Sequence, residues 1–307
     1  MEIICKKLNE YKPVFFNKTS GIPFHINDYE YPDSVKKSLI EDKLAQSDEY
    51  TWGSNKVTFF HNEKNCNVLF HYIARLLSVI QPKNKPVTAF IILSSAKKYY
   101  PTDQIFGPDH VNTGYATNDH IVIYRKEEWF KVFIHECFHF FKYDHELFDP
   151  TLMNDILKLF KVESSVNLFE SYCEIWARTL NCCMVSVITK LPWSTLLERE
   201  KKYSVRHMVN VLRHMNLTYD DLFVENSFHE NTNVLAYVVI GAILMYHDFL
   251  LDYTKDKSID AMFKITNTKD YVQFIYDHCK SKSFLDMIHH IEQNQPYKTT
   301  TMSIISF

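Results

Sequence analysis

The pattern of apolar and polar positions changes character along the chain. Residues 65–80 (NCNVLFHYIARLLSVI) repeat apolar side chains at the spacing of a helix. Residues 87–93 (VTAFIIL) and 120–125 (HIVIYR) are rich in β-branched and aromatic residues and predict two strands. The next segment, KEEWFKVFIHECFHFFKYD, predicts a helix that is apolar on most of its circumference, which is typical of a central element. From about Met153 onward nearly the whole chain has a helical pattern.

This order of elements predicts an α+β protein that is predominantly helical. Residues 86–145 would form a small mixed sheet and the central helix, and residues 146–307 a helical subdomain. Residues 1–85 carry no recognisable motif and are expected to pack as an N-terminal region on the unit formed by residues 86–307. The most apolar run, VLAYVVIGAILMY (234–246), is too short to span a bilayer and predicts a buried helix.

Composition and charge exclude some classes of protein. The 34 basic and 37 acidic residues are interspersed and give a net charge of −3, so the basic surface of a nucleic-acid-binding protein is missing. Seven cysteines without a CxxC pair indicate reduced, mostly buried thiols in an intracellular protein. The first residues, MEIICKKLNEYKP, have no apolar stretch typical of a secretory signal. We therefore expect a cytoplasmic protein without a membrane span.

The central helix contains the motif His135-Glu136-Cys137-Phe138-His139. Residues four apart lie on one face of a helix, so His135 and His139 can present two imidazoles to one Zn²⁺ ion. Glu136 can then reach a metal-bound water and act as its general base. The alternative interpretation is a helix with two histidines packed in the core, which is a costly polar load when no metal is bound.

A strand followed by a helix with HExxH and a helical second half resembles the zincin superfamily of zinc peptidases. In that superfamily the strand before the helix is the edge strand of the sheet, which borders the cleft and pairs with an extended peptide substrate. The resemblance implies that role for residues 120–125, and it implies a peptide or protein substrate. The string VNTGYATNDHIVIYRKEEWFKVFIHECFH is also similar to uncharacterised metallopeptidase-like proteins of large DNA viruses, which would place the protein in the host cytoplasm.

A catalytic zinc site needs a third protein ligand, and two residues compete for this role. His145 has the spacing of the third histidine in the metzincin motif HExxHxxGxxH. Lys142 occupies the position at which that motif has a glycine, and a lysine makes the sharp turn costlier.

The second candidate is Glu170, in the helical stretch FESYCEIWARTL. Glu170 and Glu174 share one helical face, and the residues around them are nearly all apolar. The string resembles the glutamate-bearing helix of gluzincins. The resemblance implies that Glu170 is the third ligand and that Glu174, where the family has Asp, orients a ligand histidine.

A group that stabilises the oxyanion would complete such a site. Tyr237 and His229 are the expected residues, because a polar cluster from His229 to Asn233 opens the most apolar helix and would face the cleft. His207 and His214 are further candidates. The irregular segment 110–120, with Gly114, is expected to form either the upper rim of the cleft or a plain loop.

The sequence therefore predicts a zinc-dependent peptidase that hydrolyses peptide bonds with metal-activated water. Two alternatives remain open. One is a zinc-binding or scaffold protein on a zincin fold that cleaves nothing, and the other is a metal-free helical interaction protein.

Overall fold

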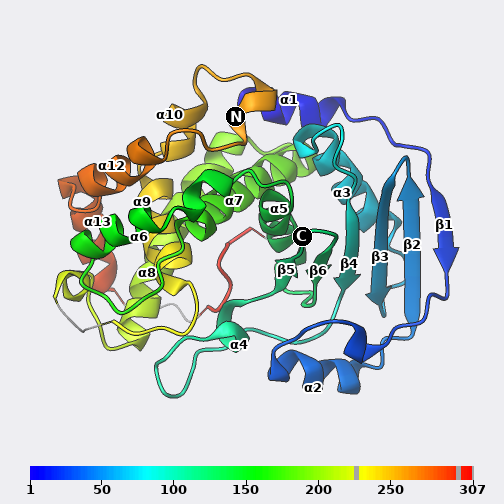
Figure 1. The fold of residues 1–307 in the computed structure, drawn as a ribbon, viewed down its shortest axis with the longest axis horizontal. Coiled ribbons are helices and arrows are strands. Elements are labelled where there is room, and N and C mark those ends of the chain that lie inside the picture. The colour runs from blue at the N-terminus through cyan, green and yellow to red at the C-terminus, as the bar shows by residue number, and fades with distance from the viewer. Residues whose placement is uncertain (225–227, 295–298, 306–307) are drawn as a thin grey trace.

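A six-stranded mixed sheet and an array of helices make up the α+β fold (Figure 1). The computed structural model describes residues 1–224, 228–294 and 299–305. Strand order in the sheet is β1-β2-β3-β4-β6-β5. Helix α5, which carries the HExxH motif, lies between this sheet and the helices of the second half (Figure 1). The predicted class, with a small mixed sheet in the first half and helices in the second, is confirmed.

The elements of the first half are α1 (Glu2–Glu10), β1 (Asn17–Ser20), η1 (Ile26–Asp28), α2 (Asp33–Asp42), β2 (Gln46–Trp52), β3 (Asn55–His61), α3 (Asn67–Ile80), β4 (Thr88–Ile92), α4 (Pro108–Val111), β5 (Gly114–Ala116), β6 (Ile121–Ile123), α5 (Trp129–Phe140) and η2 (His145–Phe148). The second half contains α6 (Pro150–Leu159), α7 (Leu168–Thr189), α8 (Trp193–His214), η3 (Asp220–Phe223), the π-helix η4 (Leu235–Ile240), α9 (Gly241–Tyr246), α10 (Phe249–Thr254), α11 (Ile259–Met262), α12 (Thr268–His278) and α13 (Lys282–Glu292).

The N-terminal region supplies half of the sheet. Strands β2 and β3 form an antiparallel hairpin closed at Trp52 and Asn55, and the loop residue Gly53 has the left-handed backbone (φ 54°) that a two-residue hairpin loop requires. Helix α3 then crosses over to β4, which lies parallel to β3. The sheet therefore runs across the expected boundary at residue 85, and the division into two regions stays a prediction.

The edge of the sheet near α5 differs from the expectation. Both predicted strands are present, as β4 and β6, but β6 is paired on both sides, with β4 and with β5. The edge strand is β5, so the assignment of residues 120–125 to the edge was wrong. A three-residue strand has no periodicity of its own, and only its pairing with β6 identifies it.

Gly114 allows β5 to approach β6. A Cβ atom at this position would lie 2.6 Å from Ile123 Cδ1 and 2.6 Å from the Val122 carbonyl oxygen. We expect Gly114→Ala to lower the free energy of unfolding by about 1–3 kcal/mol, as overpacking does. Gly107→Ala is the matched control, because the nearest atom to its added Cβ is 3.8 Å away. Urea denaturation measures both, and equal stability of the two variants would contradict the close contact.

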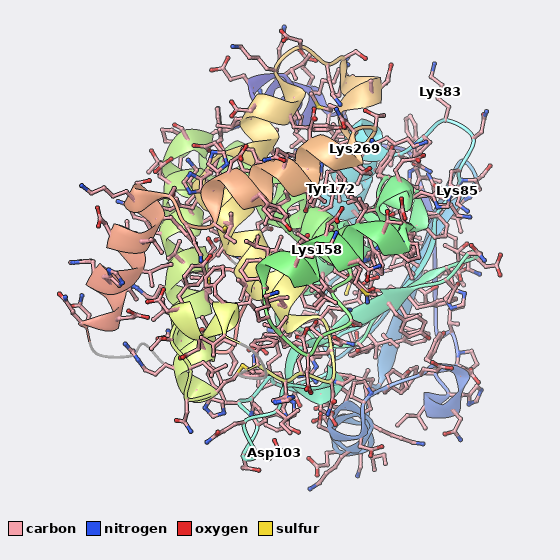
Figure 2. The ribbon with its side chains drawn as sticks, turned by 60° about the vertical axis from the view of Figure 1, so that its left-hand side comes forward. Lys83, Lys85, Asp103, Lys158, Tyr172 and Lys269 are labelled. Atoms are coloured by element: carbon pink, nitrogen blue, oxygen red, sulfur yellow. The ribbon has the colours of Figure 1, made fainter. Side chains whose placement is uncertain are left out.

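The helical half encloses α5. Figure 2 shows Tyr172 of α7 enclosed among the helices, whereas Lys83, in the turn after α3, points away from the protein. The apolar run 234–246 forms the buried η4 and α9, as predicted.

Within the described residues every helix is too short or too polar to span a bilayer. The seven cysteines are free, and all except the partly exposed Cys5 are buried.

Candidate metal centre

Helices α5 and α7 bring three ligand atoms together. The Nε2 atoms of His135 and His139, one turn apart on α5, are 3.0 Å from each other. Glu170, in the first turn of α7, places Oε2 3.0 Å from His135 Nε2 and 3.1 Å from His139 Nε2. These three side chains form a group that could hold a metal ion. They are the two histidines and the glutamate that the sequence predicted as ligands.

The chemistry of this group fits a cation. In a tetrahedral zinc site with ligands at about 2.0–2.1 Å, neighbouring ligand atoms are about 3.3–3.4 Å apart, close to the distances observed here. Burial opposes protonation of both imidazoles. Glu170 and Glu174 nevertheless raise the pKa of His135, and Cys173, Glu170 and Asp144 raise that of His139. The surroundings of the two rings thus favour positive charge.

Each histidine has a carboxylate at its other ring nitrogen. Asp144 Oδ2 lies 2.6 Å from His139 Nδ1, and Glu174 Oε2 lies 3.4 Å from His135 Nδ1. An Nδ1–H group directed at a carboxylate leaves the Nε2 lone pair available for a metal. The sequence predicted this position for Glu174, whereas Asp144 was not anticipated.

Loss of the Asp144 carboxylate is expected to weaken metal binding by about 10- to 100-fold, the range typical of groups that orient a ligand histidine. The variant is Asp144→Asn, and the measurement is a metal titration of the full chain. Asp155→Asn, in an exposed pair with Lys158, is the control for the change of charge. Unchanged affinity in Asp144→Asn would show that Asp144 does not orient His139.

The turn after α5 explains the position of Asp144. Lys142 adopts a left-handed backbone (φ 58°), so the chain turns sharply without the glycine of the metzincin motif. This turn places Asp144 beside His139. His145 is exposed, with its ring centroid 6.1 Å from that of Phe148, and it borders the cleft without joining the three ligand atoms.

Two buried cations hold Glu174 in place. Lys131 Nζ is 3.0 and 2.9 Å from the two carboxylate oxygens, and Arg178 Nε is 2.9 Å from Oε1. Burial opposes ionisation of Glu174, but Lys131, His135 and Arg178 outweigh it and hold its pKa well below the usual range. Lys131 was not predicted from the sequence, because a single lysine in an apolar helix gives no sign of its partner.

Glu136 lies beside the ligands in the same cleft, and its side chain is buried. Burial raises the pKa of its carboxyl group, and the two neighbouring histidines only partly offset that effect. Glu136 is thus a carboxylate that is poorly solvated and free to accept a proton inside the cleft.

The cleft that contains these groups has a volume of about 670 Å³. One wall is β5 with its flanking residues, from Val111 to Asn118, so the irregular segment forms the rim of the cleft. The lining also includes Phe148 and Phe169, whose rings stack with centroids 4.1 Å apart. Met302, from the segment near the C-terminus, also contributes to the lining.

Only part of the polar cluster before the apolar helix faces the cleft. Tyr237 lines it, with its ring centroid 5.7 Å from that of His135. Asn233 lines it too and donates from Nδ2 to Glu170 Oε1 at 3.2 Å. Tyr237 lies in the π-helix η4, a type of irregular turn that is frequent at functional sites.

The other oxyanion candidates lie elsewhere. His229 is half exposed and pairs with Glu163 at 2.8 Å, and it is not among the residues that line the cleft. A parallel bridge to Glu163 holds the backbone of His229 there. His207 is buried away from the cleft, and His214 Nε2 contacts the Pro101 carbonyl oxygen at 2.7 Å.

Comparisons with protein-family models, with curated proteins and with solved structures each returned no match. The geometry and chemistry of the cleft are therefore what bears on function.

Proposed function

We propose that the protein is a zinc-dependent peptidase of the gluzincin type. The observation that carries this proposal is the convergence of His135 Nε2, His139 Nε2 and Glu170 Oε2 within 3.1 Å, beside Glu136 and in an open cleft. Two imidazoles and one carboxylate are the ligand set of catalytic zinc sites that keep one position open. Bound zinc would lower the pKa of a water molecule and polarise a peptide carbonyl group.

The residues of the chain have separate tasks in this proposal. Glu136 accepts the proton of the attacking water and passes it to the leaving amine. Its raised pKa suits this task, because a carboxyl group with a pKa nearer neutrality transfers protons in both directions. Tyr237, next to the His135 ring, is placed to donate a hydrogen bond to the oxyanion.

The edge strand supports a peptide as the substrate. Within the part of the chain that the structure describes, β5 pairs with β6 alone, and its residues line the cleft. An extended peptide can add to such an edge through backbone hydrogen bonds. The stacked Phe148 and Phe169, which also line the cleft, offer an apolar surface for one of its side chains.

The position of Glu136 favours an enzyme over a zinc-binding scaffold. A carboxylate that is buried costs free energy when it has no compensating partner. Lys131 and Arg178 compensate Glu174, whereas the effect of burial on the Glu136 pKa is only partly offset by its neighbours. Catalysis gives a reason for keeping such a group, and scaffolding does not.

Digestion of a peptide mixture by the zinc-loaded full chain tests the proposal, with the products identified by mass spectrometry. We expect cleavage that a zinc chelator abolishes and that added zinc restores. Zinc binding without cleavage of any peptide would support the scaffold, and absence of bound zinc would support the metal-free interaction protein.

A further inference from the structure

A second group of potential metal ligands lies in the N-terminal region, and none of its members lines the cleft. It consists of Asp48 on β2, His61 at the end of β3 and Cys66 directly before α3. Their ligand atoms lie within 4.8 Å of one another, and all three residues are buried. Nothing in the proposed peptidase chemistry uses them.

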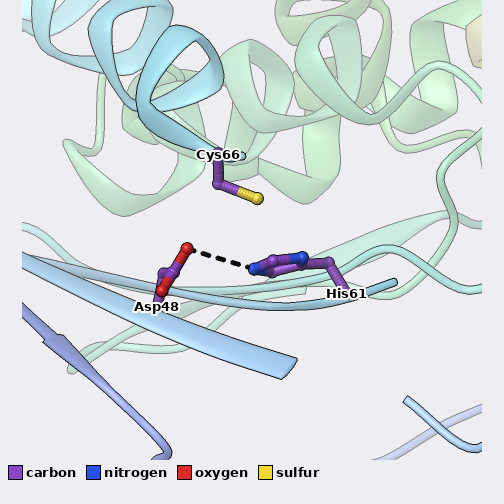
Figure 3. Close-up of side chains that lie close together, drawn as sticks. All are labelled: Asp48, His61 and Cys66. Carbon is purple, nitrogen blue, oxygen red and sulfur yellow. Dashed lines mark ion pairs between the residues drawn. The ribbon is translucent and has the colours of Figure 1, made fainter. Parts of the chain in front are cut away.

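The register of the hairpin brings two of these residues together. His61 pairs with Gln46 and Phe59 with Asp48, so Asp48 and His61 are diagonal neighbours on one face of the sheet. Tyr50, on the same face of β2, stacks on Phe70 of α3, so α3 covers this face. Figure 3 shows the Cys66 side chain pointing from the start of α3 toward Asp48 and His61.

Among the described residues, one ring nitrogen of His61 has no hydrogen-bond partner. The residue is fully buried, and this atom, Nε2, lies 3.3 Å from Asp48 Oδ2, an ion-pair contact if the ring is protonated. Its Nδ1 can donate to the carbonyl oxygen of Glu63 or accept from the Glu63 backbone N–H group, both at 3.1 Å. In the tautomer that carries the proton on Nδ1, the Nε2 lone pair is available to a metal ion, as in metal-bound histidines.

A simple ion pair between His61 and Asp48 explains the group less well. Asp48 already accepts a hydrogen bond from Ser20 Oγ at 2.7 Å and pairs with Lys18 Nζ at 2.9 Å. Its carboxylate is therefore satisfied without His61. A buried nitrogen that lacks a partner costs roughly 1–3 kcal/mol, and a bound cation removes that cost.

We propose that Asp48, His61 and Cys66 bind a second zinc ion, which ties the β2–β3 hairpin to the start of α3. Sulfur, nitrogen and oxygen together are a ligand set for zinc, whereas Mg²⁺ and Ca²⁺ take oxygen ligands. Cys66 binds as the thiolate, and its proton passes to solvent. Zinc at this position is structural, because the cleft lies elsewhere.

Cobalt substitution of the full chain tests this site independently of the peptidase. A thiolate bound to Co²⁺ gives a charge-transfer band in the near ultraviolet, and the three ligands in the cleft include no cysteine. We expect the wild type to bind two Co²⁺ ions and to show this band. Cys66→Ser should lose the band and one ion, whereas Glu170→Ala should keep the band and lose the other ion.

Cys173→Ser is the matched control, because Cys173 is also a buried thiol but lies 3.5 Å from Nδ1 of His139, one of the three candidate ligands in the cleft. It should keep the band. His61→Gln is a second variant for the case in which Cys66→Ser does not fold, and it should also lose one ion. A wild type without the band, or a band lost in Cys173→Ser and kept in Cys66→Ser, would overturn the second site without affecting the proposal for the cleft.

Discussion

Replacement of Glu136 by Gln is expected to lower the rate of peptide hydrolysis by about 10²- to 10⁴-fold, the usual contribution of a general base. Glutamine keeps the shape of the side chain but does not accept a proton from water. The three ligand atoms belong to other residues, so the metal content should stay that of the wild type. Loss of rate without loss of metal separates the role of Glu136 from that of the ligands.

The measurement is kcat/KM on one peptide identified in the digestion, together with metal per chain. Glu146→Gln is the matched control, because Glu146 is exposed, lies outside the cleft lining and pairs with Lys264 at 3.3 Å. It should retain the wild-type rate. Hydrolysis by Glu136→Gln at the wild-type rate would exclude the proposed mechanism.

Replacement of Lys131 by Met is expected to lower the free energy of unfolding by about 3 kcal/mol, the lower end of the range for a broken buried ion pair. Lys131 and Glu174 are both buried, so the variant leaves the carboxylate with Arg178 as its remaining cation. The effect is at the lower end because the Arg178 contact is retained.

Urea denaturation measures this effect against Lys158→Met, which breaks an exposed pair with Asp155 at 2.7 Å. The control should change stability by less than about 1 kcal/mol, because solvent screens such pairs. Equal effects of Lys131→Met and Lys158→Met would mean that the buried pair contributes little.

The elements that the sequence predicted well are those with a local signal. Helices α3 and α5 and strand β4 show long periodic or β-branched runs, and the structure has them within a few residues of the predicted ranges. Strands β1 and β2 were missed because they are short or polar, and pairing across the sheet forms them. The edge position of β5 depends on the same long-range pairing.

In the candidate metal centre, too, the sequence predicted the features that depend on local spacing and missed those that depend on the fold. The spacing of His135 and His139 is local to one helix, and the sequence was sufficient to pair them. Asp144 was missed because its position depends on the left-handed turn at Lys142. A lysine at this position gives no sign of such a turn. His229 was expected at the cleft, but the side chains of the polar cluster point in different directions. Asn233 lines the cleft, whereas His229 pairs with Glu163.

Zinc per chain in the purified protein, for wild type beside Glu170→Ala and His145→Ala, tests the central claim most directly. We predict that Glu170→Ala holds one zinc ion fewer than wild type and that His145→Ala holds the same number. Loss of an ion in His145→Ala and not in Glu170→Ala would contradict the glutamate-ligand centre and favour the three-histidine alternative. A wild type that binds no zinc, even after reconstitution, would contradict the metallopeptidase account as a whole.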